Sequence, residues 1–254
     1  MKTNFKKNGI QVVNNLLSHK DKNIIREVIV SNFENYIDFD TSCKNFENLK
    51  FHKKIIEFRK KNQKKFGEIY DNINLNARFR SIFYQNKFLK TFSKLLNTSK
   101  NKIYINGFMM RFDTPFDNKN TLGWHQDTWY YKMSKPNNKS AVCWTAITKN
   151  TSKNGTLIYV PNSHSKFLKS TDLKKKDRYI TQTRKIEITK KELSNKKNLN
   201  LGSGSASFFH LNLKHKSGIN YSKKIRLTVG CTFHDMGENF NSGKEFYRIS
   251  KNSI

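Results

Sequence analysis

The spacing of apolar residues changes near Lys102, and this change limits the folds that the chain can adopt. Before it, apolar side chains recur every three or four residues, the period of an amphipathic helix; after it they alternate, as in a half-buried strand. The helical part covers about residues 20–98 and the strand-rich part about 102–235. Helices followed by a run of short strands predict an α+β fold, a β-sandwich or barrel with helices packed on one sheet.

The same pattern predicts individual elements. Helices are expected over about 21–33, 49–73 and 77–96, and strands over 10–13, 103–112, 123–127, 140–148, 156–160, 205–213 and 225–233. Residues 165–200 are polar, lysine-rich and weakly periodic, so they form either an insertion over the opening of a site or a solvated loop. The length suffices for one large core, and we expect residues 1–254 to form a single domain.

The net charge of +30 is extreme, and the residue types that supply it indicate which kind of partner to expect. Lysine supplies 40 of the 49 basic residues and arginine only 9, and asparagine occurs 32 times, so a compositional bias extends over the whole chain. Arginine, the preferred residue for bidentate contacts with phosphates and bases, is scarce. A solvated lysine-rich surface is therefore favoured over a nucleic-acid partner, and attraction of an anionic small molecule is the other alternative.

Membrane and secretory signals are weak in this sequence. No apolar run approaches the ~20 residues of a membrane-spanning helix, and residues 1–13 lack the apolar core of a secretory signal. The three cysteines, Cys43, Cys143 and Cys231, are widely spaced with no CxxC pair. We therefore expect a reduced, cytoplasmic protein with no membrane partner, and the sequence makes no prediction of its oligomeric state.

The strongest candidate for chemistry is the stretch GWHQDTWYY at 123–131. On a strand, His125 and Asp127 would point to the same face, about 7 Å apart. Two histidines and one carboxylate form the facial triad of non-haem Fe(II) oxygenases, which leaves positions open for other ligands. A His-x-Asp pair alone is a weak signal, because it also arises from a strand-end histidine and a solvated aspartate.

The third ligand of such a triad would be one of the later histidines. Alternation along 205–215 places His215 on the face of Phe209 and His210 on the opposite one, which favours His215 as the ligand and leaves His210 as an outward or hydrogen-bonded residue. His164 follows a strand and is typical of a hydrogen-bonded turn. Arg226 comes eleven residues after His215, on a face otherwise made of small or polar residues, where its planar fork could hold a carboxylate.

These stretches together resemble the phytanoyl-CoA dioxygenase family of Fe(II)- and 2-oxoglutarate-dependent oxygenases. The matching stretches, in the family's order, are GWHQD at 123–127, the strand with Trp144, NGTLIYVPNSH at 154–164 and HKSGINYSKKIR at 215–226. The resemblance implies a double-stranded β-helix, a jelly-roll sandwich. At residue 162 the family usually has glycine and this chain has asparagine. Asparagine also tolerates a left-handed backbone, so the same turn can form.

The resemblance also implies roles for particular residues. The iron ligands would be His125, Asp127 and His215. The contacts to 2-oxoglutarate would be Arg226, which would bind the distal carboxylate, with Ser217, Trp144 and Met109. Trp129, Tyr130 and Tyr131 follow the metal motif, and they either line the substrate pocket or pack in the core or rim.

The implied reaction is the hydroxylation of a C–H bond by O2, with conversion of 2-oxoglutarate to succinate and CO2. A carboxylate at Asp127 favours hydroxylation over halogenation, because halogenating relatives have a small residue there. The substrate would be a small metabolite, and the lysine-rich surface would suit an anionic one. The alternatives are an oxidative demethylase acting on nucleic acid with the same metal centre, and a non-catalytic metal-binding member of the fold.

Overall fold

The computed structural model describes residues 4–40, 43, 45–117, 121–130, 139–168, 171–172 and 184–235. Its helices are α1 Asn4–Asn8, α2 His19–Phe33, α3 Leu49–Lys61, α4 Gln63–Leu75, α5 Ala77–Ser81, α6 Asn86–Leu96 and α7 Lys190–Ser194. Its strands are β1 Ile10–Val13, β2 Ile103–Asp113, β3 Ser140–Ala146, β4 Ile158–Tyr159, β5 Thr171–Asp172, β6 Arg184–Lys185, β7 Lys197–Asn198, β8 Ala206–His210, β9 His215–Lys216 and β10 Arg226–Asp235. Short 3-10 helices include η2 Ile82–Tyr84, η4 Asp127–Tyr130 and η5 Ser163–Ser165. Within these residues, no helix has the length and apolar character needed to cross a membrane.

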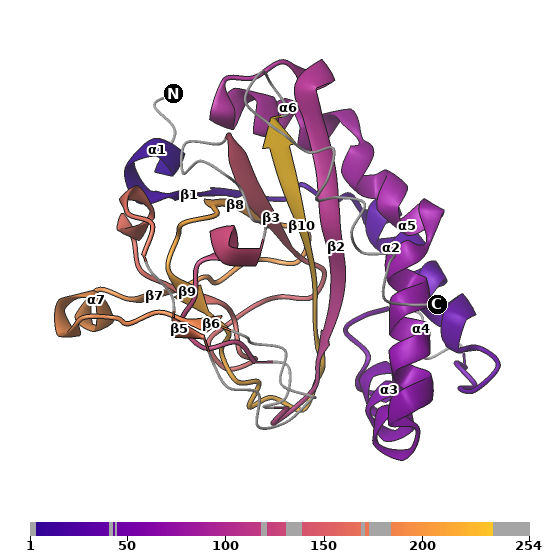
Figure 1. Ribbon diagram of the computed structural model, residues 1–254. Coiled ribbons are helices and arrows are strands. Elements are labelled where there is room, and N and C mark those ends of the chain that lie inside the picture. The colour runs from indigo at the N-terminus through magenta and orange to yellow at the C-terminus, as the bar shows by residue number, and fades with distance from the viewer. Residues whose placement is uncertain are drawn as a thin grey trace.

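The strands form antiparallel sheets. The largest has five strands in the order β1-β8-β3-β10-β2, and every neighbouring pair is antiparallel. A second sheet has the order β7-β4-β9, and β5 pairs with β6. Helices α2 to α6 lie along one side of the five-stranded sheet, and the smaller sheets and α7 lie on the other (Figure 1). The α+β class predicted from the sequence is confirmed.

The main core lies between the helices and the five-stranded sheet. Phe33 of α2, Phe66 of α4 and Phe112 of β2 pack with ring centroids 5.6–6.2 Å apart. Burying each such ring stabilises the fold by about 1.5–3 kcal/mol. β10 sends its apolar residues to the same core: Leu227, Val229, Cys231 and Phe233. Its alternate residues face the other side of the sheet, as the sequence predicted.

A second, smaller core fills the space between the two larger sheets. It joins Trp144 and Phe209 of the five-stranded sheet to Leu157, Leu199 and Leu213 on the side of the smaller sheet. The polar face of β10 therefore faces the inner space between the two sheets, beside these apolar side chains.

Two of the predicted helices are interrupted. The helix expected over 49–73 breaks at Asn62, whose φ and ψ of −134° and 59° end α3 and begin α4. The helix expected over 77–96 breaks at Gln85, where ψ is 146°. Neither side chain caps the helix that follows, and the apolar spacing continues across both breaks, so periodicity does not register them.

Buried histidines make the stability of the metal-free protein depend on pH. Burial lowers the pKa of His210 and of His234 to about 4. Between pH 6.5 and 4 the unfolded chain therefore binds more protons than the folded one. The contribution of each histidine to the free energy of unfolding is complete above pH 6.5 and is lost as the pH falls to 4, by on the order of 3 kcal/mol per histidine. Urea unfolding at pH 7.5 and 5.0 should show about 2 kcal/mol of this loss per histidine. It should shrink in His234→Gln but persist in His19→Gln, since His19 is exposed.

Candidate metal centre

His125 and His215 meet through their backbones. They form an isolated antiparallel bridge, in which each N–H donates to the other residue's carbonyl at 3.0 and 3.1 Å. Their ring centroids lie 4.1 Å apart. Nδ1 of His125 lies 2.7 Å from the Gly123 carbonyl oxygen, and Nδ1 of His215 lies 2.8 Å from that of Leu213. A carbonyl only accepts, so each Nδ1 carries the proton and each Nε2 presents a lone pair.

Asp127 joins the two imidazoles at the start of η4. Its Oδ1 lies 3.4 Å from His125 Nε2, and its Oδ2 lies 3.6 Å from His215 Nε2. One ligand atom from each of the three residues lies within 4.8 Å of the others. Neighbouring donors around an ion with bonds of ~2.1 Å would be about 3 Å apart. The residues therefore fit a single divalent ion, with the two-histidine, one-carboxylate donor set of mononuclear non-haem iron.

The protonation states of this cluster suit a cation. Burial lowers the pKa of His215 to about 4, so its ring is neutral at pH 7. Burial alone would raise the pKa of Asp127, but His215 and His125 together hold it below its usual value. A metal thus finds a neutral imidazole and an ionised carboxylate already in place, and few protons need to leave.

The strand predicted through 123–127 is wrong, although the residues it carries converge. His125 makes only the isolated bridge, and Asp127 opens a 3-10 helix, so a turn of the backbone brings the two side chains together. The alternation used to separate His215 from His210 also fails, because β8 ends at His210 and the chain then turns. His215 still reaches the inner side, where its ring centroid lies 5.0 Å from that of Phe209.

Arg226 lies on the same inner side, buried at the start of β10. Its Nε and Nη2 donate to Oδ2 of Asp113, its register partner on β2, at 3.2 and 2.6 Å, and its Nη1 donates to the Gly155 carbonyl. Arg111 donates to the other oxygen of Asp113 from Nη2 at 2.7 Å. Burial alone would raise the pKa of Asp113, but the two guanidinium groups hold it well below its usual range.

The other residues suggested to contact 2-oxoglutarate lie in two different places. Met109 and Trp144 lie on the inner face of the sheet with Arg226, and the Trp144 ring lies across Gly230. Ser217 follows β9, and its Oγ accepts from Leu122 N–H at 3.1 Å, which ties it to the loop before His125.

Polar atoms without partners face this inner space. Among the described residues, Trp144 Nε1, Thr228 Oγ1 and Ser207 Oγ are buried and make no hydrogen bond. Register pairs place Ser207 opposite Trp144, and Thr228 opposite Arg111. A buried polar group without a partner costs about 1–3 kcal/mol, so these atoms fit a polar ligand that lies along the sheet toward Arg226. Thr228 is one of the small or polar residues that the sequence placed on the strand face of Arg226, and the sequence gave no signal for Ser207.

Gln126 ties the metal motif to the segment that begins at residue 165. Its Nε2 donates to the carbonyls of Lys166 and Asn212, both at 2.7 Å, and its Oε1 accepts from Leu168 N–H at 2.9 Å. Further along that segment, Ile186 N–H donates to the Trp124 carbonyl at 3.2 Å. Lys166, Leu168 and Ile186 therefore hold parts of this segment against the residues next to the candidate metal ligands.

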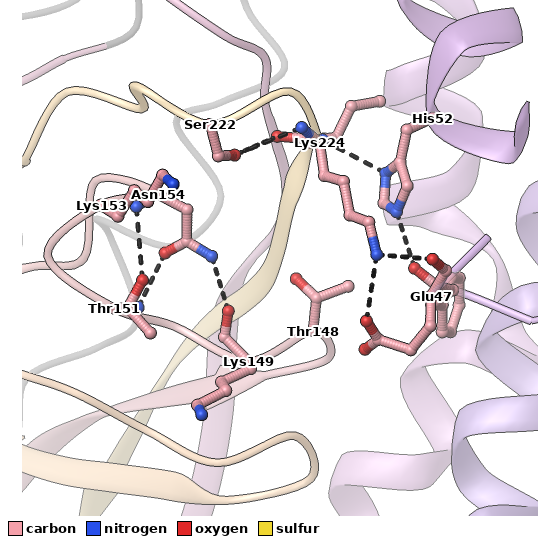
Figure 2. A pocket seen from close by; sticks show the side chains of 11 residues that line it. Glu47, His52, Thr148, Lys149, Thr151, Lys153, Asn154, Ser222 and Lys224 are labelled. Carbon is pink, nitrogen blue, oxygen red and sulfur yellow. Dashed lines mark hydrogen bonds and ion pairs between the residues drawn. The ribbon is translucent and has the colours of Figure 1, made fainter. Parts of the chain in front are cut away.

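A separate cavity of about 220 Å³ lies between α3 and the loops that precede Gly155 and Arg226 (Figure 2). His52 forms one wall: its Nε2 donates to the Phe46 carbonyl at 2.6 Å, and its Nδ1 accepts from Ile225 N–H at 3.2 Å. Lys224 contacts Glu47. None of its described lining residues is a candidate metal ligand, but His52 fixes the backbone immediately before Arg226.

The structure also describes His164 and Asn162, the two loop residues that the sequence analysis singled out. His164 Nε2 lies 3.2 Å from the Lys6 carbonyl, in the hydrogen-bonded turn that the sequence indicated. Asn162 has φ +62°, so it adopts the left-handed conformation expected of it. The side chains of Trp129 and Tyr130, and all of Tyr131, lie outside the described residues.

Gly230 leaves room for the ring of Trp144 to pack against β10. A Cβ at residue 230 would lie 3.2 Å from the Trp144 ring, closer than an ordinary contact. Gly230→Ala should therefore push the ring toward the inner space and weaken 2-oxoglutarate binding by about tenfold, within the usual cost of overpacking. Titration of the metal-loaded protein would measure this. Gly67→Ala in α4 is the matched control, because its Cβ would meet nothing within 4 Å.

Fold and site together define a class: an α+β protein of antiparallel sheets with a two-histidine, one-carboxylate centre. The profile of the phytanoyl-CoA dioxygenase (PhyH) family matches residues 5–228, and the chain belongs to this family. Over 132 residues it is 27% identical to an ectoine dioxygenase from Bordetella parapertussis, a match that covers 48% of this chain and 43% of that protein. The chain thus spans less than half the length of this relative.

Solved structures share the fold. EvdO2 from Micromonospora carbonacea, complexed with 2-oxoglutarate, superposes with a TM-score of 0.61 at 15% identity over 91% of this chain and 88% of that one. The epimerase SnoN, in complex with Fe3+, alpha-ketoglutarate and nogalamycin RO, gives a TM-score of 0.61 at 12% identity, covering 91% and 81%.

Proposed function

We propose that this protein is an Fe(II)- and 2-oxoglutarate-dependent dioxygenase that hydroxylates a C–H bond of a small metabolite. The observation that carries the proposal is the convergence of His125 Nε2, His215 Nε2 and the Asp127 carboxylate. The family membership and the solved complexes of EvdO2 and SnoN support the choice of metal and cosubstrate. We also infer one domain with a double-stranded β-helix, supported by the two facing antiparallel sheets.

The iron and the 2-oxo acid would supply the oxidising chemistry: 2-oxoglutarate, O2 and R–H give succinate, CO2 and R–OH. The protein's own residues hold and orient these partners. His125, Asp127 and His215 would bind the ion and leave positions for the 2-oxo acid and O2. Arg226 has three N–H groups occupied by Asp113 and Gly155, and one N–H on each terminal nitrogen remains for a distal carboxylate.

The partnerless groups on the inner face complete this cosubstrate site. Thr228 Oγ1 and Trp144 Nε1 would donate to 2-oxoglutarate between the ion and Arg226, and Met109 would pack beside it. Ser217 would act through the loop that carries His125, since its hydroxyl is bonded to Leu122. The apolar walls from Leu157, Leu199 and Leu213 would exclude water from the reacting atoms.

A single-turnover experiment tests this proposal. Protein loaded with Fe(II) and 2-oxoglutarate without oxygen is then exposed to O2, and succinate is measured. We expect one succinate per iron site, formed faster when a suitable metabolite is present and not faster with methylated single-stranded DNA. Bound 2-oxoglutarate that persists unchanged would instead support a non-catalytic metal-binding protein, and acceleration by the DNA would support a demethylase.

A further inference from the structure

The carboxylate of Asp113 is shared between two buried arginines. Its Oδ1 accepts from Arg111, and its Oδ2 accepts from both Arg226 and Arg111; the closest N–O distances are 2.7 Å to Arg111 and 2.6 Å to Arg226. The side chains of all three residues are at most 12% exposed. Two cations and one anion are therefore enclosed together on the inner face of the sheet, with a net charge of +1.

Strand register fixes this arrangement. Asp113 is paired with Arg226 across β2 and β10, and Arg111 is paired with Thr228 one step further along. Arg111 also lies over the Trp144 ring, 5.8 Å from its centroid. The array thus extends from the start of β10 toward the aromatic floor of the space between the sheets, and every member points into that space.

We propose that Asp113 is an internal counterion that sets the affinity of this site for the distal carboxylate of 2-oxoglutarate. This inference rests on the function proposed above. Asp113 compensates one of the two guanidinium charges when no ligand is present, and it holds Arg226 through its Nε–Nη2 edge. The residual charge of +1 matches one incoming carboxylate. Asp113 touches neither the metal ligands nor, in this arrangement, the reacting atoms, so it is a positioning and specificity residue.

Asp113 affects the binding of a ligand carboxylate in two opposite ways, and the larger effect decides whether its removal strengthens or weakens binding. Its negative charge repels a second carboxylate beside Arg226, and removal of that charge would favour the ligand. Its hydrogen bonds orient Arg226, but the Gly155 carbonyl and the backbone contact of Ile225 with His52 also hold that residue in place. Asparagine keeps one acceptor oxygen. We therefore expect the loss of charge to outweigh the loss of orientation.

Thermal unfolding of the anaerobic Fe(II)-loaded protein, with and without 2-oxoglutarate, tests this proposal. Asp113→Asn should unfold at a lower temperature than wild type without the ligand, because two buried cations lose their counterion. It should bind 2-oxoglutarate about tenfold more tightly, as expected for removing one nearby like charge at a partly shielded site. The ligand-induced rise in Tm should therefore exceed that of wild type. A merely structural role would lower both melting temperatures together.

The matched control is Asp21→Asn. Asp21 is a buried carboxylate at the start of α2 that pairs with Lys87, away from the two arginines, so its removal should lower both melting temperatures and leave the ligand-induced shift as in wild type. Arg111→Gln provides the converse test and does not require Asp113→Asn to fold. It leaves Arg226 and Asp113 with no net charge, so 2-oxoglutarate should bind about tenfold more weakly.

The outcomes separate the two claims. A ligand-induced shift in Asp113→Asn no larger than in wild type would overturn the role of Asp113, as would unchanged 2-oxoglutarate affinity in Arg111→Gln. No ligand-induced shift in wild-type protein would overturn the proposed function, and the inference with it.

Discussion

His215→Ala is expected to abolish tight metal binding while the protein stays folded. The substitution leaves one imidazole and one carboxylate, which cannot hold an ion in the arrangement that three converging donors provide. We expect the affinity for Mn(II) or Fe(II) to fall by at least about 100-fold, because even residues that only orient metal ligands contribute 10–100-fold. The backbone bridge between residues 125 and 215 does not use the side chain, so it should persist.

Anaerobic titration calorimetry with Mn(II) would measure this loss, and circular dichroism would confirm folding. His210→Ala is the matched control, since His210 lies five residues away and its Nδ1 accepts only the Asn212 N–H. It should bind Mn(II) as wild type does. Equal Mn(II) affinity in His215→Ala and wild type would show that the ion is held elsewhere.

Arg226→Lys is expected to separate cosubstrate binding from metal binding. A lysine keeps the charge but cannot hold Asp113, Gly155 and a carboxylate with one planar group. Charge-assisted hydrogen bonds contribute about 1.5–3 kcal/mol each, so the loss of a two-bond contact should weaken 2-oxoglutarate binding by about 100-fold or more. The affinity for Mn(II) should change little, because no atom of Arg226 belongs to the donor set.

Titration of 2-oxoglutarate into the Mn(II)-loaded variants would measure the effect. Arg59→Lys is a suitable control: Arg59 also bonds a carboxylate, that of Asp117, and the backbone of β2, but it does not contact Asp113. Its 2-oxoglutarate affinity should match that of wild type. A variant of Arg226 that binds 2-oxoglutarate normally would place the distal carboxylate away from β10.

Periodicity predicted the elements that have one buried face. β10 is such a case, because its apolar residues face the helices while Arg226, Thr228 and Gly230 face the inner space. Periodicity could not show the break at Asn62, since the apolar stripe continues on both sides of it. It also assigned a strand to His125 and Asp127, because a turn that brings two residues together leaves the same two-residue spacing in the sequence.

The array around Asp113 was missed for a different reason. A charged residue at the end of an apolar strand reads as the start of a loop, and its partner Arg226 is 113 residues away in the chain. One signal was present: Arg111 and Asp113 share the alternate positions of Met109 on the same strand, an unusual place for two charges. Only the pairing of β2 with β10 shows that these charges face Arg226.

The most direct test of the metal and cosubstrate site is the visible absorption of the anaerobic protein with Fe(II) and 2-oxoglutarate. A 2-oxo acid that chelates Fe(II) gives a weak charge-transfer band without any substrate. We predict this band in wild type, its loss in His215→Ala, and a shift of its titration to higher 2-oxoglutarate concentration in Arg226→Lys. Folded wild-type protein that binds Fe(II) but shows no band at saturating 2-oxoglutarate would contradict the account.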